Sequence, residues 1–219
     1  MEKIKKILDD IKISKGIQRK KGEYSEKVAK EVWLGIAKKY IGSVKVGEDA
    51  KKVWSELIKY AFAHEECIYD LNKGIGLIGQ TGSGKTITMD ILNDFISVDD
   101  IIYIRDGQLA HFKFKIISAK VIGARFSEKG FEIITKYSSM GNLCIDDLGS
   151  ENLVSKYYGE SVNVIEEIIE NRYSKNLITH FTSNLDSNDI LKTYGDRVYS
   201  RLMHSCNIIT LNDEDYRIK

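Results

Sequence analysis

Proline is absent from this chain of 219 residues, whereas an average usage of about 5% would give roughly eleven. Its three cysteines are an odd number at wide spacing, and they give no sign of a disulfide framework or a CxxC metal pair. The four histidines show no metal-ligand spacing such as HExxH. No apolar run approaches the roughly 20 residues of a membrane helix, and the charged N-terminus does not fit a signal peptide. We therefore expect a cytoplasmic protein with no membrane partner.

An excess of charge of one sign is also lacking, because the formal net charge is only +1. Hydrophobic residues make up 42% and charged residues 30%, which fits one globular domain with a modest appendage. The charge is unevenly placed, since residues 1–30 carry ten basic against five acidic side chains. Such a basic end has two interpretations at this point, a solvated helix face or a nucleic-acid contact.

The N-terminal part of the chain shows helical periodicity. Apolar residues at helical spacing predict helices over the first dozen residues, over 25–40 and over 48–64. In the second of these, the predicted apolar face consists of Val28, Val32, Ile36 and Tyr40. We interpret residues 1–45 as a short helical segment that could bind a partner, and residues 46–219 as the core domain.

From Lys73 onward, apolar runs of strand length alternate with amphipathic stretches of helix length. The predicted strands are 74–79, 114–119, 142–147, 177–184 and 207–211, with a further hairpin strand at 101–105. The predicted helices are 85–96, 119–127, 130–138, 161–173 and 196–203. This alternation is typical of an α/β fold, here a five-stranded parallel sheet with helices on both faces, preceded by the short helical N-terminal segment.

Residues 79–86, GQTGSGKT, match the phosphate-binding pattern G-x-x-x-x-G-K-[ST] in full. The motif follows an apolar strand and opens a helix, so backbone N–H groups and the helix N-terminus can bind phosphate oxygens. Lys85 is expected to contact the β and γ phosphates, and the Thr86 hydroxyl to bind Mg²⁺. The predicted site for ATP and Mg²⁺ consists of Gly79, Gln80, Thr81, Gly82, Ser83, Gly84, Lys85 and Thr86.

A second motif, NLCIDDLGSE, places two carboxylates at the end of a predicted strand. An enzyme that hydrolyses ATP needs a carboxylate there for the magnesium ion, and we assign that role to Asp146. Asp147 is the candidate base for the attacking water. Glu151 lies four residues further on and could share this role, so the sequence leaves two candidates.

The order of these motifs resembles that of the AAA+ ATPases, which belong to the P-loop NTPases. Within them, it is similar to the bacterial replicative helicase loaders of the DnaC type and to the IstB-type transposition helper ATPases. The resemblance covers about residues 70–219. It is carried by KGIGLIGQTGSGKT, LCIDDLGSE, THFTSNL, YGDRVYSRLMHSCNIITL and the terminal DYR.

Further residue roles follow from this resemblance. Asn184, in THFTSNL, is similar to the sensor 1 residue that positions the attacking water. Arg201, in DRVYSRL, resembles the arginine finger that reaches the nucleotide of a neighbouring subunit, and Arg197 lies one turn earlier in support. Arg217, in DYR, resembles a sensor 2 arginine that contacts the nucleotide. A full C-terminal helical lid is not expected.

The resemblance implies a Mg²⁺-dependent ATPase of the helicase-loader type, an ATP-controlled switch that acts on a replicative helicase and single-stranded DNA. It also implies self-association through a shared ATP site. Two alternatives are a transposition helper that delivers a transposase to DNA, and a nucleotide-binding interaction module with little turnover. A small-molecule kinase fits less well, because the two arginines accompany sensor-like residues.

Overall fold

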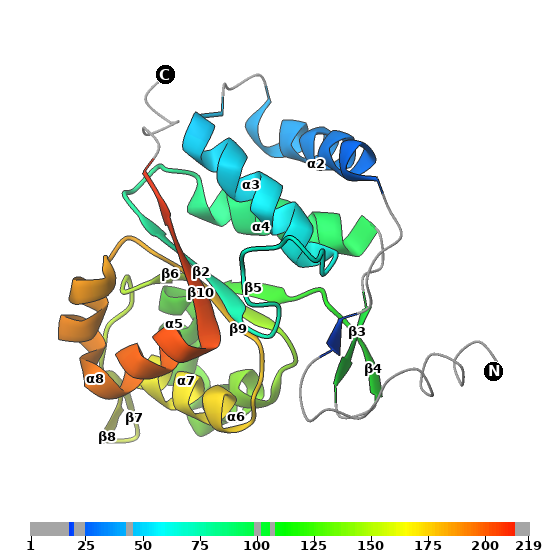
Figure 1. Cartoon of the computed structure of the whole chain (residues 1–219). Coiled ribbons are helices and arrows are strands. Elements are labelled where there is room, and N and C mark those ends of the chain that lie inside the picture. Colours follow the sequence, from blue (N-terminus) through cyan, green and yellow to red (C-terminus); the bar gives the residue numbers. More distant parts are fainter. Residues whose placement is uncertain (1–17, 20–24, 43–45, 99–101, 106–107, 213–219) are drawn as a thin grey trace.

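A central sheet of five parallel strands organises the computed structural model of the chain (Figure 1), which describes residues 18–19, 25–42, 46–98, 102–105 and 108–212. The strand order is β10-β2-β9-β6-β5. The strands are β2 (Gly74–Gly79), β5 (Lys115–Ser118), β6 (Leu143–Leu148), β9 (Thr179–Ser183) and β10 (Cys206–Leu211). Each overlaps one of the five predicted strands, and the prediction of a five-stranded parallel sheet is confirmed.

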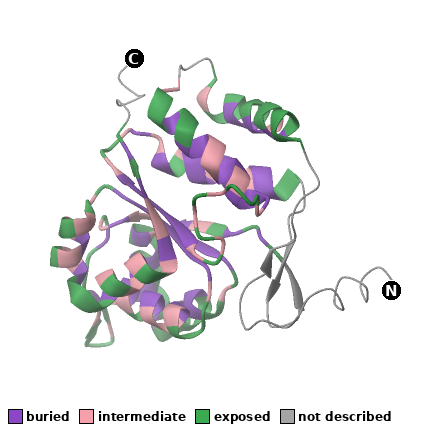
Figure 2. Ribbon diagram, in the orientation of Figure 1, coloured by how far each residue is buried: buried purple, intermediate pink, exposed green. Residues whose placement is uncertain are grey.

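Helices cover both faces of this sheet, as predicted. One face carries α2 (Glu26–Ile41), α3 (Glu48–Ala61) and α4 (Lys85–Val98); the other carries α5 (Ala119–Lys129), α6 (Phe131–Ser139), α7 (Val164–Ser174) and α8 (Ser187–Ser205). Two apolar clusters fill the space between the sheet and these layers, and Figure 2 shows the buried residues along the strands and the inner helix faces. Within the described part of the chain, no helix is long and apolar enough to cross a bilayer.

Short antiparallel strands lie outside the central sheet. β1 (Gln18–Arg19), β3 (Ile102–Arg105) and β4 (Gln108–His111) form a three-stranded sheet in the order β1-β3-β4. The hairpin strand predicted at 101–105 is therefore confirmed as β3. A second hairpin, β7 (Ser155–Tyr157) with β8 (Glu160–Val162), was not predicted, because each strand has only three residues and little alternation of apolar and polar side chains.

The N-terminal helix α2 packs into the core, and its buried residues share one apolar cluster with α3, α4 and the central sheet. Its buried face is Ala29, Trp33, Ile36 and Ala37, whereas Val28 and Tyr40 of the predicted face are exposed. The Trp33 ring packs against Trp54 of α3 and Phe95 of α4, with centroid distances of 6.0 and 5.2 Å. The buried face of α2 is therefore rotated relative to the predicted one. The cause is Trp33, which was not part of the predicted face and whose large indole occupies the centre of the contact. The helix predicted for the first dozen residues lies outside the described part of the chain.

Trp33→Ala is expected to lower the free energy of unfolding by about 3–5 kcal/mol, because it empties a packed site between three helices. Leu34→Ala, one position along the same helix, is the matched control, since Leu34 is 52% exposed. Urea denaturation monitored by circular dichroism measures both. Equal small losses would show that α2 contributes little to the stability of the core.

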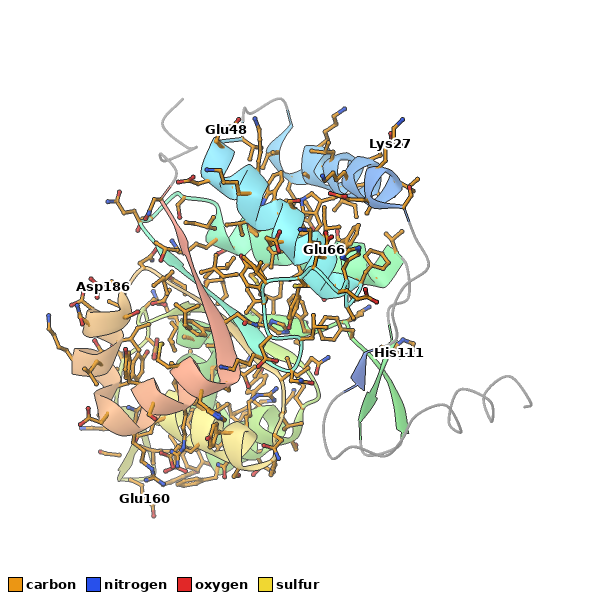
Figure 3. All side chains as sticks on the ribbon, viewed as in Figure 1. Lys27, Glu48, Glu66, His111, Glu160 and Asp186 are labelled. Atoms are coloured by element: carbon orange, nitrogen blue, oxygen red, sulfur yellow. The ribbon has the colours of Figure 1, made fainter. Side chains whose placement is uncertain are left out.

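Helix α8 is longer than the predicted helix 196–203 and has a kink at Gly195, where φ is 77° and ψ is 172°. A residue with a side chain is strained in this left-handed region, so glycine meets a backbone requirement here. The kink divides α8 into a first half that starts at the Asp186 cap, labelled in Figure 3, and a second half that leads into β10. The predicted helix 196–203 corresponds only to the second half of α8.

Candidate functional site

The loop between β2 and α4 needs glycine at three positions. Gly79, Gly82 and Gly84 have φ values of 151°, 87° and 85°. A Cβ at Gly79 would lie 2.1 Å from the carbonyl oxygen of Leu211 on the neighbouring strand β10. The loop therefore curves where only glycine fits, and α4 begins directly after it at Lys85.

Lys85 folds back over this loop. Its side chain is almost buried, with 7% of the residue exposed. Its Nζ donates hydrogen bonds to the carbonyl oxygens of Gly79 and Gln80, at 2.8 and 2.7 Å. The ammonium group therefore lies at the concave side of the loop, where the sequence predicted an anion-binding cation.

Asp146 lies at the centre of a hydroxyl–carboxylate cluster. Thr86 Oγ1 donates a hydrogen bond to Asp146 Oδ1 at 2.8 Å, and Thr182 Oγ1 donates to the same oxygen at 2.7 Å. The two residues to which the sequence assigned the metal are thus in contact across two elements, α4 and β6. Thr182, on β9, was not predicted.

Asp147 has an unusual backbone, with φ of 56°. The pairing register between β6 and β9 shifts at this point, and the Asp147 amide donates to Thr182 Oγ1 at 2.8 Å. Asn184 Nδ2 donates to Asp147 Oδ1 at 2.7 Å. A non-glycine residue in this conformation costs about 1–3 kcal/mol, which the surrounding hydrogen bonds offset. The structure therefore brings together the predicted base and the predicted sensor residue.

Glu151, the second candidate base, has a different environment. It is buried, with 8% of the residue exposed. Tyr194 donates its hydroxyl hydrogen to Glu151 Oε1, and the Gly149 amide donates to Oε2 at 2.9 Å. Burial, together with the nearby Glu151 carboxylate, raises the pKa of Tyr194 far above its ordinary value. Both carboxylate oxygens thus bind structural partners, which favours Asp147 over Glu151 as the base.

A pocket of about 430 Å³ opens above these residues. One side is polar and contains the loop from Thr81 to Thr86 with Asp146, Asp147, Thr182 and Asn184. A second wall contains Tyr40, Ile41, Val46, Ala50 and Trp54, which come from the end of α2, the start of α3 and the segment between them. Glu48, labelled in Figure 3, marks the end of α3 that borders this wall. This wall was not predicted, because its residues lie about 25 to 40 positions before the phosphate loop and carry no motif.

Two hydrogen bonds fix the position of this wall. Trp54 Nε1 donates to Thr88 Oγ1 at 3.1 Å, which ties α3 to the first turn of α4. Tyr40 donates its hydroxyl hydrogen to Asp94 Oδ2 at 2.7 Å, which ties the end of α2 to the same helix. This bond raises the pKa of Tyr40 to about 12. Both tethers converge on α4, the helix that carries Lys85 and Thr86.

Comparison of sequences finds no matching family model and no matching curated protein. Comparison of structures finds DnaI, 19% identical with a TM-score of 0.56, which covers 84% of this chain and 93% of its own. The DnaC helicase loader is 18% identical with the same TM-score of 0.56, and covers 84% of this chain and 99% of its own. The chain has the AAA+ P-loop fold. The replication initiator DnaA bound to AMPPCP and single-stranded DNA shares this AAA+ fold at 17% identity and a TM-score of 0.54, over 81% of this chain and half of DnaA.

The two arginines lie elsewhere in this AAA+ fold, on the second half of α8. Neither lines the 430 Å³ pocket. Both form ion pairs with Glu170 of α7, Arg197 through Nε at 2.5 Å and Arg201 through Nη1. The structure therefore separates them from the phosphate loop of their own chain. Arg217, the remaining predicted site residue, lies outside the described part of the chain.

Proposed function

We propose that this protein is a Mg²⁺-dependent ATPase of the helicase-loader type, which converts ATP and water to ADP and phosphate. The observation that carries the proposal is the contact between Thr86 and Asp146 at 2.8 Å, next to a glycine loop that surrounds the Lys85 ammonium group. These groups come from two separate segments of chain, residues 79–86 and the end of β6, and together they provide the cation, hydroxyl and carboxylate that a nucleoside triphosphate with magnesium requires.

The residues present fit a magnesium ion. Thr86 and Asp146 offer one hydroxyl and one carboxylate, both oxygen ligands, and Mg²⁺ is typically held by one or two carboxylates together with substrate phosphates. In the described part of the chain, no group of three or more His, Cys, Asp or Glu side chains forms a self-sufficient metal cage. When bound, the ion would neutralise charge on the β and γ phosphates.

The chain's own residues supply the remaining steps. Lys85 Nζ would exchange its bonds to the Gly79 and Gln80 carbonyls for bonds to phosphate oxygens. Asp147 would accept a proton from the attacking water, and Asn184, which contacts Asp147 Oδ1, would orient the water. Because the Asp147 backbone is held in the left-handed region, the position of its carboxylate is set before the nucleotide arrives.

The nucleobase would contact the wall formed by α2 and α3. Ile41, Val46 and Ala50 line this part of the pocket with apolar atoms. A pocket of about 430 Å³ lies within the range of about 300–1,000 Å³ that is usual for small-molecule sites. This arrangement would make the end of α2 part of the nucleotide site.

The partners we propose are a replicative helicase, single-stranded DNA and further copies of this chain. Support comes from the shared fold with a helicase loader and with an initiator bound to single-stranded DNA. Phosphate release, measured with and without single-stranded DNA and with the replicative helicase of the source cell, tests the proposal. Turnover that neither addition changes, and no complex on size exclusion, would contradict the loader function while leaving the ATPase in place.

Asp147→Asn is expected to slow ATP hydrolysis by about 100-fold or more while ATP binding stays within threefold, because the amide cannot accept the proton from water. Glu151→Gln keeps the acceptor for Tyr194 and is expected to leave turnover within about threefold. Single-turnover hydrolysis and equilibrium ATP binding separate the two effects. The reverse pattern would make Glu151 the base.

A nucleotide-binding module with little turnover is the second candidate function. The observation that favours it is the hydrogen bond from Asn184 to Asp147 Oδ1, which occupies one oxygen of an already short side chain. In that case, ATP binding is expected to be tight in the wild type while phosphate release stays near the uncatalysed rate under every condition above.

A further inference from the structure

The strands β6 and β9 do not pair residue for residue at the edge of the nucleotide pocket. Between two consecutive pairs of the ladder, β6 advances from residue 145 to residue 148, whereas β9 advances only from residue 181 to residue 183. Asp146 and Asp147 therefore lie opposite a single residue of β9, Thr182. Two residues opposite one define a β-bulge, which is rare between parallel strands and redirects side chains where it occurs.

The bulge explains how two consecutive carboxylates reach one pocket. In a regular strand, successive side chains point to opposite faces of the sheet. Asp146 and Asp147 are consecutive, and yet both line the 430 Å³ pocket. The backbone of Asp147, with φ of 56°, departs from the extended conformation at this point. The directions of both carboxylates therefore depend on the contacts that hold the bulge in place.

The Thr182 hydroxyl makes two of these contacts. A bulge leaves its extra residue without a partner in the ladder, and here Thr182 Oγ1 accepts the amide hydrogen of Asp147 at 2.8 Å. Because a hydroxyl has a single hydrogen, Thr182 can direct that hydrogen to Asp146 Oδ1, 2.7 Å away. Only 1% of Thr182 is exposed, so water competes poorly for either bond. One side chain thus fixes the backbone of Asp147 and the carboxylate of Asp146.

These bonds also determine which oxygen of Asp146 is available. Oδ1 accepts hydrogen bonds from both Thr86 and Thr182, whereas Oδ2 accepts none from the part of the chain that the structure describes. Oδ2 is therefore the atom left for a magnesium ion or its water ligands. The single hydrogen of Thr182 is already used, so this residue has none to donate to a phosphate oxygen.

We propose that Thr182 is a positioning residue for ATP hydrolysis, which aims Asp146 at the magnesium ion and holds Asp147 in its left-handed conformation. This proposal rests on the proposed ATPase function. It deepens that function because it assigns the geometry of both carboxylates to one hydroxyl on a different strand. Loss of the hydroxyl should therefore disturb metal binding and hydrolysis but leave the binding of nucleotide alone intact.

Thr182→Val tests this role, because valine keeps the shape of threonine without its hydroxyl. It is expected to lower kcat about 10- to 100-fold, since a misplacement of reacting groups by about 1 Å has an effect of that size. The Kd for ATP without magnesium is expected to stay within about threefold, because residues 79–86 are unchanged. Thr182→Ser keeps the hydroxyl and is expected to retain kcat within about threefold. Single-turnover hydrolysis and equilibrium binding of a fluorescent ATP analogue measure these effects.

Two further measurements do not depend on turnover. Mn²⁺ replaces Mg²⁺ in a titration of the chain with a non-hydrolysable ATP analogue, and electron paramagnetic resonance follows the free ion. Thr182→Val is expected to bind Mn²⁺ about tenfold more weakly, the usual loss when a partner of a metal-binding carboxylate is removed. In the nucleotide-free protein, the Asp147 amide loses its acceptor, so its hydrogen exchange measured by NMR is expected to be about tenfold faster.

Thr179→Val is the control, because it makes the same change at a buried position on the same strand. Thr179 lies at the amino end of β9, where its hydroxyl accepts from Arg172 Nε and donates to the Leu177 carbonyl oxygen. This variant is expected to lower the urea midpoint at least as much as Thr182→Val but to leave kcat within about threefold. Equal losses of kcat in the two variants would overturn the positioning role. Thr182→Ala also lacks the hydroxyl and replaces Thr182→Val in every measurement if the valine variant does not fold.

The remaining outcomes separate this proposal from the ATPase proposal. If Thr182→Val keeps the kcat and the Mn²⁺ affinity of the wild type, the positioning role is wrong and the ATPase stands. If Thr182→Val weakens magnesium-free ATP binding about tenfold or more, Thr182 acts on the nucleotide itself, and the positioning role is again wrong. A wild-type chain that binds ATP but releases no phosphate would contradict the ATPase, and with it the role in hydrolysis. In that case, weaker Mn²⁺ binding by Thr182→Val would still support the positioning of Asp146.

Discussion

Lys85→Ala is expected to lower ATP affinity by about 100-fold or more and to abolish turnover. Two charge-assisted hydrogen bonds to phosphate oxygens contribute about 1.5–3 kcal/mol each, and 1.4 kcal/mol corresponds to a factor of ten in affinity. The fold should persist, because the Lys85 ammonium donates to the carbonyl oxygens of its own loop and to the nearby Ser83 hydroxyl, all within residues 79–85. Equilibrium binding of a fluorescent ATP analogue and phosphate release measure the two effects.

Lys120→Ala is the matched control for this variant, since Lys120 is exposed at the start of α5 and does not line the pocket. It is expected to bind ATP as the wild type does. Circular dichroism and the urea midpoint of Lys85→Ala should stay close to those of the wild type. Unchanged ATP affinity in a folded Lys85→Ala protein would contradict the assignment of residues 79–86 as the phosphate site. Loss of the fold would instead show that Lys85 stabilises the loop.

Arg172→Met is expected to cost about 4 kcal/mol or more of unfolding free energy, a large share of the roughly 5–15 kcal/mol of a typical domain. Arg172 on α7 is fully buried. Its guanidinium donates five hydrogen bonds of 2.6–2.9 Å, to Thr179 Oγ1 and to the carbonyl oxygens of Tyr137, Met140, Gly141 and Ile178. Methionine fills a similar volume but leaves these buried acceptors without their donors.

Arg125→Met provides the control for this stability prediction. Arg125 is exposed on α5 and donates one hydrogen bond, at 2.7 Å, to the Tyr137 hydroxyl. Its replacement is expected to cost about 1 kcal/mol or less. Arg172→Lys should also destabilise strongly, because an ammonium group has three donors where the guanidinium has five. Urea midpoints within error of the wild type for Arg172→Met would show that the carbonyl cluster does not hold α7 to the sheet.

The sequence by itself determined the parallel sheet, its helical layers and the phosphate loop. These features depend on contiguous residues: a buried parallel strand appears as a short apolar run, and GQTGSGKT contains in eight positions the glycines, lysine and hydroxyl that one loop needs. The adjacent acidic pair at the end of β6 is also contiguous in sequence. Its position near the phosphate loop was predictable because parallel strands bring their carboxyl ends to one edge of the sheet.

The tertiary structure alone decided which side chains meet. Thr182 contacts Asp146 because β9 lies beside β6, and Glu151 turns to Tyr194 because the loop after β6 folds against α8. The buried face of α2 was mispredicted for a similar reason, since Trp33 packs on helices that begin about 15 and 50 positions later.

Arg197 and Arg201 show most clearly which features a sequence pattern does not predict. Their spacing placed Arg197 and Arg201 on one face of a helix, but only Glu170 on α7 and the Tyr173 ring give them different exposures and partners. A local pattern encodes the period and ends of an element, because the backbone geometry repeats along the chain. Contacts between elements depend on strand register and on the volume of side chains distant in sequence, and these are set only when the whole core packs.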